Sequence, residues 1–273
     1  MTPKACVFGN PIAQSKSPII HQHFASQQGI ALLYEKRCPE VAAFESELTA
    51  FFASEETVGA NVTAPFKERA LVWASDLSEQ ARRAGAVNTL IKHVNGITGD
   101  NTDGVGIVAD LAFHGFDIND KNVLMIGAGG AARGALPAIV DAGAASLTVY
   151  NRTRERASAL IEHAGSYVDE TACNLRVFSK GMNEFDLIIN ATTLSLQGQL
   201  PELPSTIYAD ATLAYDMVYL DKDTVFMDAA LNAGCTKVVD GLGMLLEQAA
   251  FSFEHWFGVK PNTDELREKL RQN

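Results

Sequence analysis

Short apolar runs alternate with longer amphipathic stretches along this chain. The runs predict strands at 5–8, 32–37, 121–126, 146–151, 185–192, 214–219 and 236–241, and the stretches predict helices at 17–28, 41–53, 65–73, 128–143, 154–165, 223–235 and 243–258. Strands that alternate with helices indicate α/β architecture with parallel sheets. We therefore predict two α/β domains, one formed by residues 1–103 plus 240–273 and the other by residues 104–239.

Two of the predicted helices have a clear apolar face. In the helix 41–53, Val41, Phe44, Leu48 and Phe51 or Phe52 share one side. The helix 243–258 ends in four aromatic residues that are expected to fill the core, namely Phe251, Phe253, Trp256 and Phe257. Gln248 places an amide among these apolar neighbours, so it needs a polar partner.

Asn95-Gly96 is a strong signal for a β-hairpin with a two-residue type I′ turn. Counting outward from that turn puts Val94 opposite Ile97 and Asn88 opposite Asp103. A bulge near Gly99 would shift the pairing by one residue. Asp103 also suits the N-cap of the helix that follows it, which is a purely structural alternative to a functional role.

The segment KNVLMIGAGGAAR, residues 121–133, predicts where a pyrophosphate would bind. Gly127 can form the tight turn after the strand, Gly129 allows the backbone to approach phosphate oxygens, and Ala132 is small enough for close helix packing. The free amides at the start of the helix would face the anion. A structural strand-to-helix turn is the alternative, but the strand at 146–151 completes the βαβ context of a nucleotide site.

The loop after that second strand indicates which dinucleotide is bound. An NAD site usually has an acidic residue about 20 positions after the glycines. This chain instead has Asn151, Arg152, Thr153, Arg154, Glu155 and Arg156. Guanidinium groups suit a 2′-phosphate, so the loop favours NADP over a merely solvated basic helix start.

Three further residues near predicted helix starts are candidates for binding an anion or for catalysis. Ser17 is expected to be an N-cap with Pro18 in the first turn, while Ser15 has no capping role to explain it; the pair would suit a carboxylate. Lys67 lies in the first turn of the helix after Pro65, where the helix dipole would lower its pKa. An ordinary exposed lysine is the alternative, but this place follows the carboxyl end of a strand, where α/β sheets bind ligands.

Composition narrows the class of protein. The 273 residues carry a net charge of −11, which argues against nucleic acid as a partner. Cys6, Cys38, Cys173 and Cys235 are scattered, so they support neither a disulfide framework nor a thiolate metal site, and we expect no metal. The start of the sequence lacks the apolar stretch of a signal peptide, and no run approaches the length of a membrane span, so we expect a cytoplasmic protein.

Taken in order, eight segments resemble the shikimate dehydrogenase family. They are GNPIAQSKSP (9–18), NVTAPFK (61–67), GAVNTL (85–90), GDNTDG (99–104), GAGGAARG (127–134), NRTRERA (151–157), DMVY (216–219) and GLGMLLEQAA (241–250). The resemblance covers nearly the whole chain. It implies a substrate domain made from the N-terminal part and the last helices, with a dinucleotide-binding Rossmann domain between them.

The resemblance implies reversible reduction of 3-dehydroshikimate to shikimate with NADPH, by a monomer or homodimer. It matches Lys67 and Asp103 to the family's catalytic pair, in which an ammonium stabilises and protonates the oxygen that receives negative charge. It implies that Ser15 and Ser17 hold the substrate carboxylate, that Thr63, Asn88 and Gln248 hold the hydroxyls, and that Tyr219 contacts the substrate. For the cofactor it implies Gly127, Ala128, Gly129, Gly130, Ala131, Asn151, Arg152, Thr153, Arg156, Met217 and Gly241.

The sequence departs from the family pattern at two places. Ser195 replaces a usual glycine in NATTLSLQG, which puts the conformation of that loop in doubt, and LDKDT after Tyr219 lacks a frequent proline. Three rival functions are a quinate/shikimate dehydrogenase that uses NAD or NADP, a catalytically silent NADP sensor, and a folate-linked dehydrogenase. A sensor could dispense with Lys67 and Asp103, and the paired serines and NTDG have no role in a folate-linked enzyme.

Overall fold

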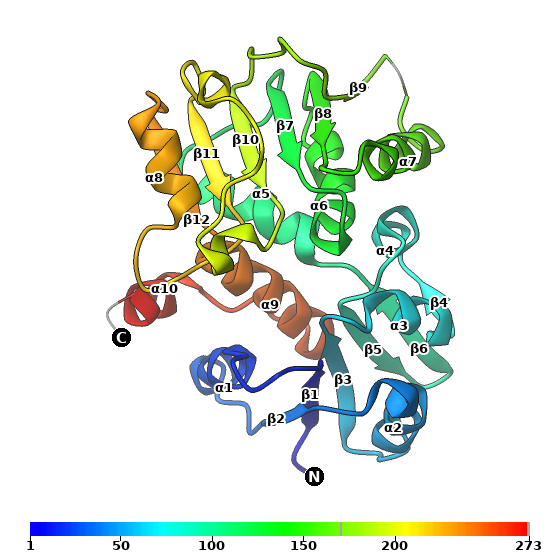
Figure 1. The fold of residues 1–273 in the computed structure, drawn as a ribbon. Helices are drawn as coiled ribbons and strands as arrows, with labels where there is room; N and C mark the ends of the chain where they lie inside the picture. The colour runs from blue at the N-terminus through cyan, green and yellow to red at the C-terminus, as the bar shows by residue number, and fades with distance from the viewer. Residues whose placement is uncertain (170, 272–273) are drawn as a thin grey trace. The chain divides into compact units, whose positions relative to one another are not determined.

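The structure is a computed structural model that describes residues 1–169 and 171–271. This part of the chain forms two compact units. Unit 1 consists of Met1–Gly106 and the segment that begins at Leu246, and unit 2 consists of Ile107–Leu245. Figure 1 shows the sheet and the surrounding helices of each unit.

Unit 1 is built on a six-stranded sheet in the order β2-β1-β3-β5-β6-β4. Its elements are β1 (Lys4–Phe8), α1 (Ser17–Gln27), β2 (Leu33–Arg37), the 3-10 turn η1 (Val41–Ala43), α2 (Phe44–Phe52), β3 (Thr57–Val62), α3 (Lys67–Trp73), β4 (Asp76–Leu77), α4 (Glu79–Ala84), β5 (Thr89–His93), β6 (Gly96–Asp100) and α10 (Asp264–Arg271). Two helices, α5 (Asp103–Phe113) and α9 (Leu242–Phe257), begin in one unit and end in the other. The sheet is mixed, because β5 runs antiparallel to both β3 and β6.

Successive side chains of a strand point to opposite faces of the sheet, and here each face packs against helices. Cys6 and Phe8 of β1 pack in one cluster with Phe44 and Leu48 of α2. Ala5 and Val7 belong to a separate cluster, against which Trp256 of α9 packs. The helix predicted at 41–53 starts later than expected, at Phe44, and Val41 is 52% exposed rather than part of its buried face.

The predicted register of the hairpin is wrong. His93 pairs with Gly96 and Thr89 with Asp100, so Val94 and Asn95 form the loop and Gly96 begins β6 with φ of +152°. The physical reason is that β6 is held from its other side as well, by β4 and by hydrogen bonds between Ser75 and Ile97. Tertiary pairing therefore overrides the local preference of the Asn-Gly turn.

Unit 2 contains a fully parallel sheet in the order β12-β11-β10-β7-β8-β9. Its remaining elements are β7 (Asn122–Ile126), α6 (Gly130–Asp141), β8 (Ser146–Tyr150), α7 (Arg154–Gly165), β9 (Asn174–Val177), β10 (Leu187–Asn190), η2 (Leu194–Gln197), η3 (Ser205–Tyr208), β11 (Leu213–Asp216), α8 (Val225–Asn232) and β12 (Lys237–Asp240). Val123 and Met125 face the cluster that includes α5, α6 and α7, and Leu124 and Ile126 face the cluster that includes α8. β4, α4, β9 and α10 were not among the predicted elements.

Candidate functional site

Most of the site residues expected in unit 1 lie near one end of its strands, the end at which β1 and β3 terminate. Thr63 follows the carboxyl end of β3, Asn88 precedes the antiparallel β5, and Asp103 follows β6. Hydrogen bonds join these segments, since the Val62 amide donates to the Asn88 carbonyl at 2.8 Å and the Thr63 amide donates to Phe8 at the end of β1, also at 2.8 Å. The strand order thus gathers residues that are far apart in the sequence.

Lys67 and Asp103 form an ion pair at this edge. Lys67 is the first residue of α3 and Asp103 the first residue of α5, and Lys67 Nζ lies 2.5 Å from Asp103 Oδ2. The Asp103 side chain is 9% exposed and that of Lys67 is 22% exposed. A partly buried ammonium with a fixed carboxylate partner can stabilise a developing oxyanion and donate a proton to it.

The Asp103 carboxylate is held in place by its neighbours. Asn88 Nδ2 donates to Asp103 Oδ1 at 2.8 Å, and the Asp103 amide donates to Asn101 Oδ1 at 3.1 Å. The contact between Asn88 and Asp103 is therefore present, although the strand register that predicted it is wrong. It arises because the chain turns at Asn101 and Thr102, where the Thr102 amide donates to Asn88 Oδ1 at 2.9 Å. Asp103 is a helical residue, not the residue before the helix.

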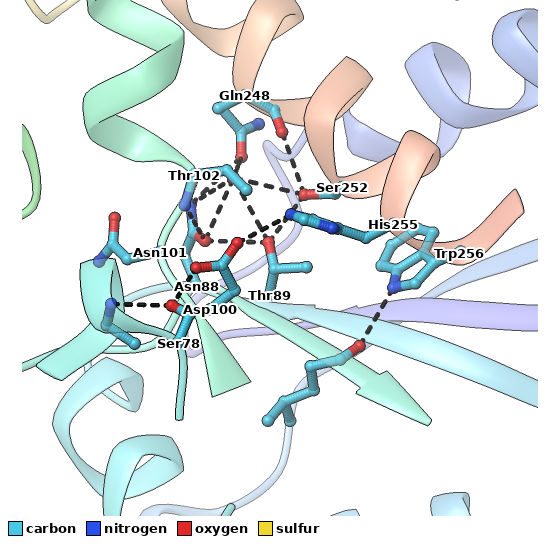
Figure 2. Close-up of polar contacts among 12 residues, drawn as sticks. Ser78, Asn88, Thr89, Asp100, Asn101, Thr102, Gln248, Ser252, His255 and Trp256 are labelled. Carbon is cyan, nitrogen blue, oxygen red and sulfur yellow. Dashed lines mark hydrogen bonds and ion pairs between the residues drawn. The ribbon is translucent and has the colours of Figure 1, made fainter. Parts of the chain in front are cut away.

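Gln248 of α9 lies against Asn88 and Thr102, as Figure 2 shows. Its Oε1 accepts hydrogen bonds from Asn88 Nδ2 at 3.4 Å and from Thr102 Oγ1 at 3.5 Å. These contacts answer the prediction that the Gln248 amide needs a polar partner. Unit 1 thus brings Lys67, Asn88, Asp103 and Gln248 together.

A buried layer of polar residues that the sequence interpretation missed lies beside this group. Asn61 Nδ2 donates to Ser252 Oγ at 3.0 Å, and the hydroxyls of Ser252 and Thr89 are 2.7 Å apart. Thr89 Oγ1 in turn donates to Asn88 Oδ1 at 2.9 Å. The sequence did contain a signal for this layer, because amide and hydroxyl residues occupy strand and helix positions whose neighbours are apolar core residues.

Ser15 and Ser17 lie together after β1, but their local roles differ from the prediction. Helix α1 begins at Ser17. Its N-cap is Lys16, whose side chain makes no capping hydrogen bond. Ser15 Oγ accepts a hydrogen bond from the Ser17 amide at 3.3 Å and donates to Ser17 Oγ at 3.1 Å. Ser17 is therefore not the N-cap, and Ser15 does have a structural role, because its short side chain reaches the amide two residues ahead.

In unit 2 the glycine turn follows the central strand β7. Gly127 has φ of +113°, which suits glycine, and a Cβ there would lie 3.1 Å from Thr192 in the loop after β10. A Cβ at Gly129 or Gly130 would meet nothing within 4 Å, so the backbone at the start of α6 is open to a ligand. The strand order reverses between β7 and β10, and such switch points are where open α/β sheets bind dinucleotides. Ala132 is fully buried, as close helix packing requires.

The arginine loop follows the neighbouring strand, β8. Arg152, Thr153, Arg154 and Arg156 are all exposed, and the Arg154 guanidinium donates to the Phe178 carbonyl at 2.8 Å. Asn151 Nδ2 donates to the Thr153 carbonyl at 2.8 Å and shapes the turn. Arg152 and Arg156 therefore present guanidinium groups at the surface where a phosphate could be bound, whereas Arg154 is engaged by a backbone carbonyl.

Met217, Tyr219 and Gly241 lie at the same carboxyl edge of this sheet. Met217 and Tyr219 follow β11, and Gly241 follows β12. A Cβ at Gly241 would overlap the carbonyl oxygen of Met217, so the two loops can approach only with glycine at this position. Burial raises the pKa of Tyr219, which keeps its hydroxyl protonated and able to donate a hydrogen bond.

Residues 1–169 and 171–271 contain neither a metal-binding cluster nor a helix that could span a membrane. No group of three His, Cys, Asp or Glu side chains in residues 1–169 and 171–271 could hold a metal ion. None of the helices in these same ranges combines the length and apolar character needed to cross a membrane.

Comparison with protein families gives three matches along the chain. Residues 7–90 match the family described as "Shikimate dehydrogenase substrate binding domain", residues 109–197 match "Shikimate / quinate 5-dehydrogenase", and residues 241–271 match "Shikimate 5'-dehydrogenase C-terminal domain". The first match contains Lys67 and Asn88, and the second contains the glycine turn.

Whole-length relatives agree with these matches. The chain is 44% identical over 272 residues to the shikimate dehydrogenase (NADP(+)) of Alkalilimnicola ehrlichii and 46% identical over 276 residues to that of Shewanella woodyi, with 99% of each chain covered in both cases. Among solved structures, the shikimate 5-dehydrogenase of Thermus thermophilus in complex with NADP(H) and shikimate is 32% identical, with a TM-score of 0.88 and 99% of both chains covered.

Proposed function

Since the chain belongs to the shikimate dehydrogenase family, we propose that it reduces 3-dehydroshikimate to shikimate with NADPH, reversibly, on the route to chorismate and the aromatic amino acids. The observation that carries this proposal at the level of chemistry is the ion pair of Lys67 and Asp103, 2.5 Å apart. Carbonyl reduction requires such a partly buried proton donor.

NADPH supplies the hydride that adds to the ketone carbon. The Lys67 ammonium stabilises the negative charge that forms on the ketone oxygen and then transfers one proton to it. In the reverse direction the neutral Lys67 amine removes the proton from the hydroxyl. Asp103 orients the ammonium through the ion pair, while Asn88 holds the carboxylate through its 2.8 Å hydrogen bond.

The remaining polar residues of unit 1 are proposed to bind the substrate. Ser15 and Ser17 present two hydroxyls at the start of α1, a place that favours a carboxylate. Thr63, Asn88 and Gln248 are assigned to the ring hydroxyls, and Tyr219 is assigned a contact with the same molecule. Except for Tyr219, all of these residues belong to the predicted domain 1–103 with 240–273.

The predicted domain 104–239 is proposed to bind NADP. The open backbone at Gly129 and Gly130 suits the pyrophosphate, together with the neighbouring Gly127, Ala128 and Ala131. The exposed side chains of Arg152, Thr153 and Arg156 and the half-buried Asn151 are assigned to the 2′-phosphate. Met217, and Gly241 just outside this range, are assigned to the nicotinamide side. We propose action in the cytoplasm as a monomer or homodimer, with small molecules and not nucleic acid as partners.

Replacement of Lys67 tests the proposal directly. With shikimate and NADP+ at saturation, Lys67→Ala is expected to lower kcat by about 10²–10⁴-fold, the usual contribution of a positioned acid or base. Lys4→Ala is the matched control, because it also removes a lysine from an ion pair of unit 1, with Glu56. Reduction of NADP+ is followed by absorbance. Wild-type kcat in Lys67→Ala would contradict the role of Lys67, and no NADP+ reduction by the wild-type protein would contradict the proposed reaction.

A further inference from the structure

Asp216 is a fully buried carboxylate at the end of β11. Its Oδ1 accepts hydrogen bonds from Asn190 Nδ2 at 3.0 Å and from the Val218 amide at 3.1 Å. Its Oδ2 accepts from Ser195 Oγ at 2.5 Å and from Thr224 Oγ1 at 2.7 Å. A carboxylate offers about four acceptor positions, so these four uncharged donors satisfy it completely.

The donors come from separate segments, so the carboxylate connects them. Asn190 ends β10, Ser195 lies in η2, and Val218 follows β11. Thr224 is the N-cap of α8. We call these residues together with Asp216 the Asp216 cluster. Breaking one of its bonds would loosen the loops after β10 and β11, because a buried donor and a buried acceptor would lose their partners.

The Asp216 cluster is directly connected to the glycine turn. Asn190 Oδ1 accepts hydrogen bonds from the amide and the hydroxyl of Thr192, at 3.1 Å and 2.7 Å. Thr192 is also the residue whose methyl group would meet a Cβ at Gly127. On the other side Asp216 is followed by Met217, whose carbonyl packs against Gly241. The cluster therefore sets the position of two loops that border the proposed dinucleotide site.

We propose that Ser195 and Asp216 are positioning residues for NADP, which hold the loops after β10 and β11 in the conformation that binds the nicotinamide half of the cofactor. A residue without a hydroxyl at position 195 would leave the carboxylate with three donors. The serine lies in a 3-10 turn that closes at Gly198, with φ of +66°, so it occupies its place without a left-handed backbone. This inference rests on the proposed use of NADP.

The charge state of Asp216 supports the same role for Ser195. Burial raises the pKa of Asp216, while the hydrogen bonds from Ser195 and Thr224 oppose that effect. Removing the Ser195 hydroxyl therefore favours protonation of Asp216. It also removes the hydrogen bond that joins the loop after β10 to Asp216.

Steady-state kinetics of Ser195→Ala test the proposal. We expect the KM for NADP+ to rise roughly tenfold, the effect of one hydrogen bond to a charged group, with kcat and the KM for shikimate changed less than about twofold. Ser195→Gly removes the same hydroxyl without adding bulk, so it is a second test variant and should show the same rise.

Ser146→Ala is the matched control. Ser146 is equally buried in the sheet of unit 2, and its hydroxyl donates to Asn122 at 2.7 Å at the amino end of β7 and β8. It should lower the Tm without a change in the KM for NADP+. If Ser195→Ala and Ser195→Gly leave this KM unchanged, or raise it no more than Ser146→Ala does, the proposal is wrong.

Calorimetric titration of NADP+ separates this result from the proposed function. The Kd of the wild-type protein and of Ser195→Ala can be compared without any turnover. A roughly tenfold weaker Kd in the variant supports the positioning role even if shikimate is not the substrate, whereas equal values overturn it.

Discussion

Replacing His255 by glutamine is expected to destabilise unit 1 in a way that depends on pH. His255 lies in the last turn of α9, and its Nε2 is 2.8 Å from Asp100 Oδ2 at the end of β6 (Figure 2). The hydrogen bond to Asp100 raises the pKa of His255 above its usual 6.5. Burial opposes ionisation of Asp100, but hydrogen bonds from His255 and Ser78 outweigh it and hold the pKa of Asp100 below its ordinary value.

The size of the effect follows from the exposure of the pair. A hydrogen bond to a charged group contributes about 1.5–3 kcal/mol, and the 41% exposure of the His255 side chain reduces this to about 1 kcal/mol through solvent screening. In a protein of this size that corresponds to a fall in Tm of about 2–4 °C.

The sign of the pH dependence follows from the direction of each shift. The raised pKa of His255 gives a contribution that is complete below pH 6.5 and is lost as the pH rises through the folded value. The lowered pKa of Asp100 gives a contribution that is present above its unfolded pKa, about 3.9, and is lost as the pH falls through the lower folded value. His255→Gln should therefore lower the Tm more at pH 6.0 than at pH 8.5.

Thermal unfolding followed by circular dichroism at these two pH values, at equal ionic strength, measures the effect. His93→Gln is the control, because His93 is an exposed histidine of the same unit. Asp100→Asn and the double variant complete a thermodynamic cycle, which isolates the coupling between His255 and Asp100. An equal loss of Tm at both pH values, or a coupling that does not weaken toward pH 8.5, would refute this reasoning.

Three further predictions concern ligand binding. Gly129→Ala should raise the KM for NADP+ about tenfold or more at unchanged Tm. Gly127→Ala should in addition destabilise the fold by about 1–3 kcal/mol, because Gly127 has φ of +113°. Equal Tm values for the two variants would contradict this prediction. Arg152→Ala should raise the KM for NADP+ about 10–100-fold and leave the KM for NAD+ unchanged. Arg154→Ala should change neither KM, because the Arg154 guanidinium binds a backbone carbonyl. A parallel rise of both KM values in Arg152→Ala would exclude recognition of the 2′-phosphate by Arg152. Gln248→Ala should raise the KM for shikimate about tenfold with little change in kcat, and an unchanged KM would remove Gln248 from the substrate site.

The sequence was sufficient to predict features that depend on local chemistry. The glycine turn after β7 is one such feature, because only the residues of the turn itself decide whether φ near +113° is accessible at Gly127. Lys67 at the start of a helix is another, since Pro65 and the end of the preceding strand locate that start.

Features that depend on several segments at once could not be predicted in the same way. The register of β5 and β6 is decided by Ser75 and β4 as well as by the Asn95-Gly96 turn. The role of Ser195 depends on Asp216, which is 21 positions away and buried, so the serine appeared in the sequence only as a departure from the family pattern. Partners across a sheet are set by tertiary packing, which local propensity does not report.

The division of unit 1 into two stretches of sequence, on either side of unit 2, has a consequence for biosynthesis. Ser252 and Trp256 emerge from the ribosome only after all of residues 107–245, yet they supply the partners of Asn61 and of the Leu90 carbonyl. Unit 2 is continuous in sequence, so its sheet can form during translation. The sheet of unit 1 is still incomplete at that stage, and part of the interior of unit 1 is still hydrated. Unit 1 therefore completes its packing only after all of unit 2 has been synthesised, which reverses the usual order of maturation from the N-terminus onward.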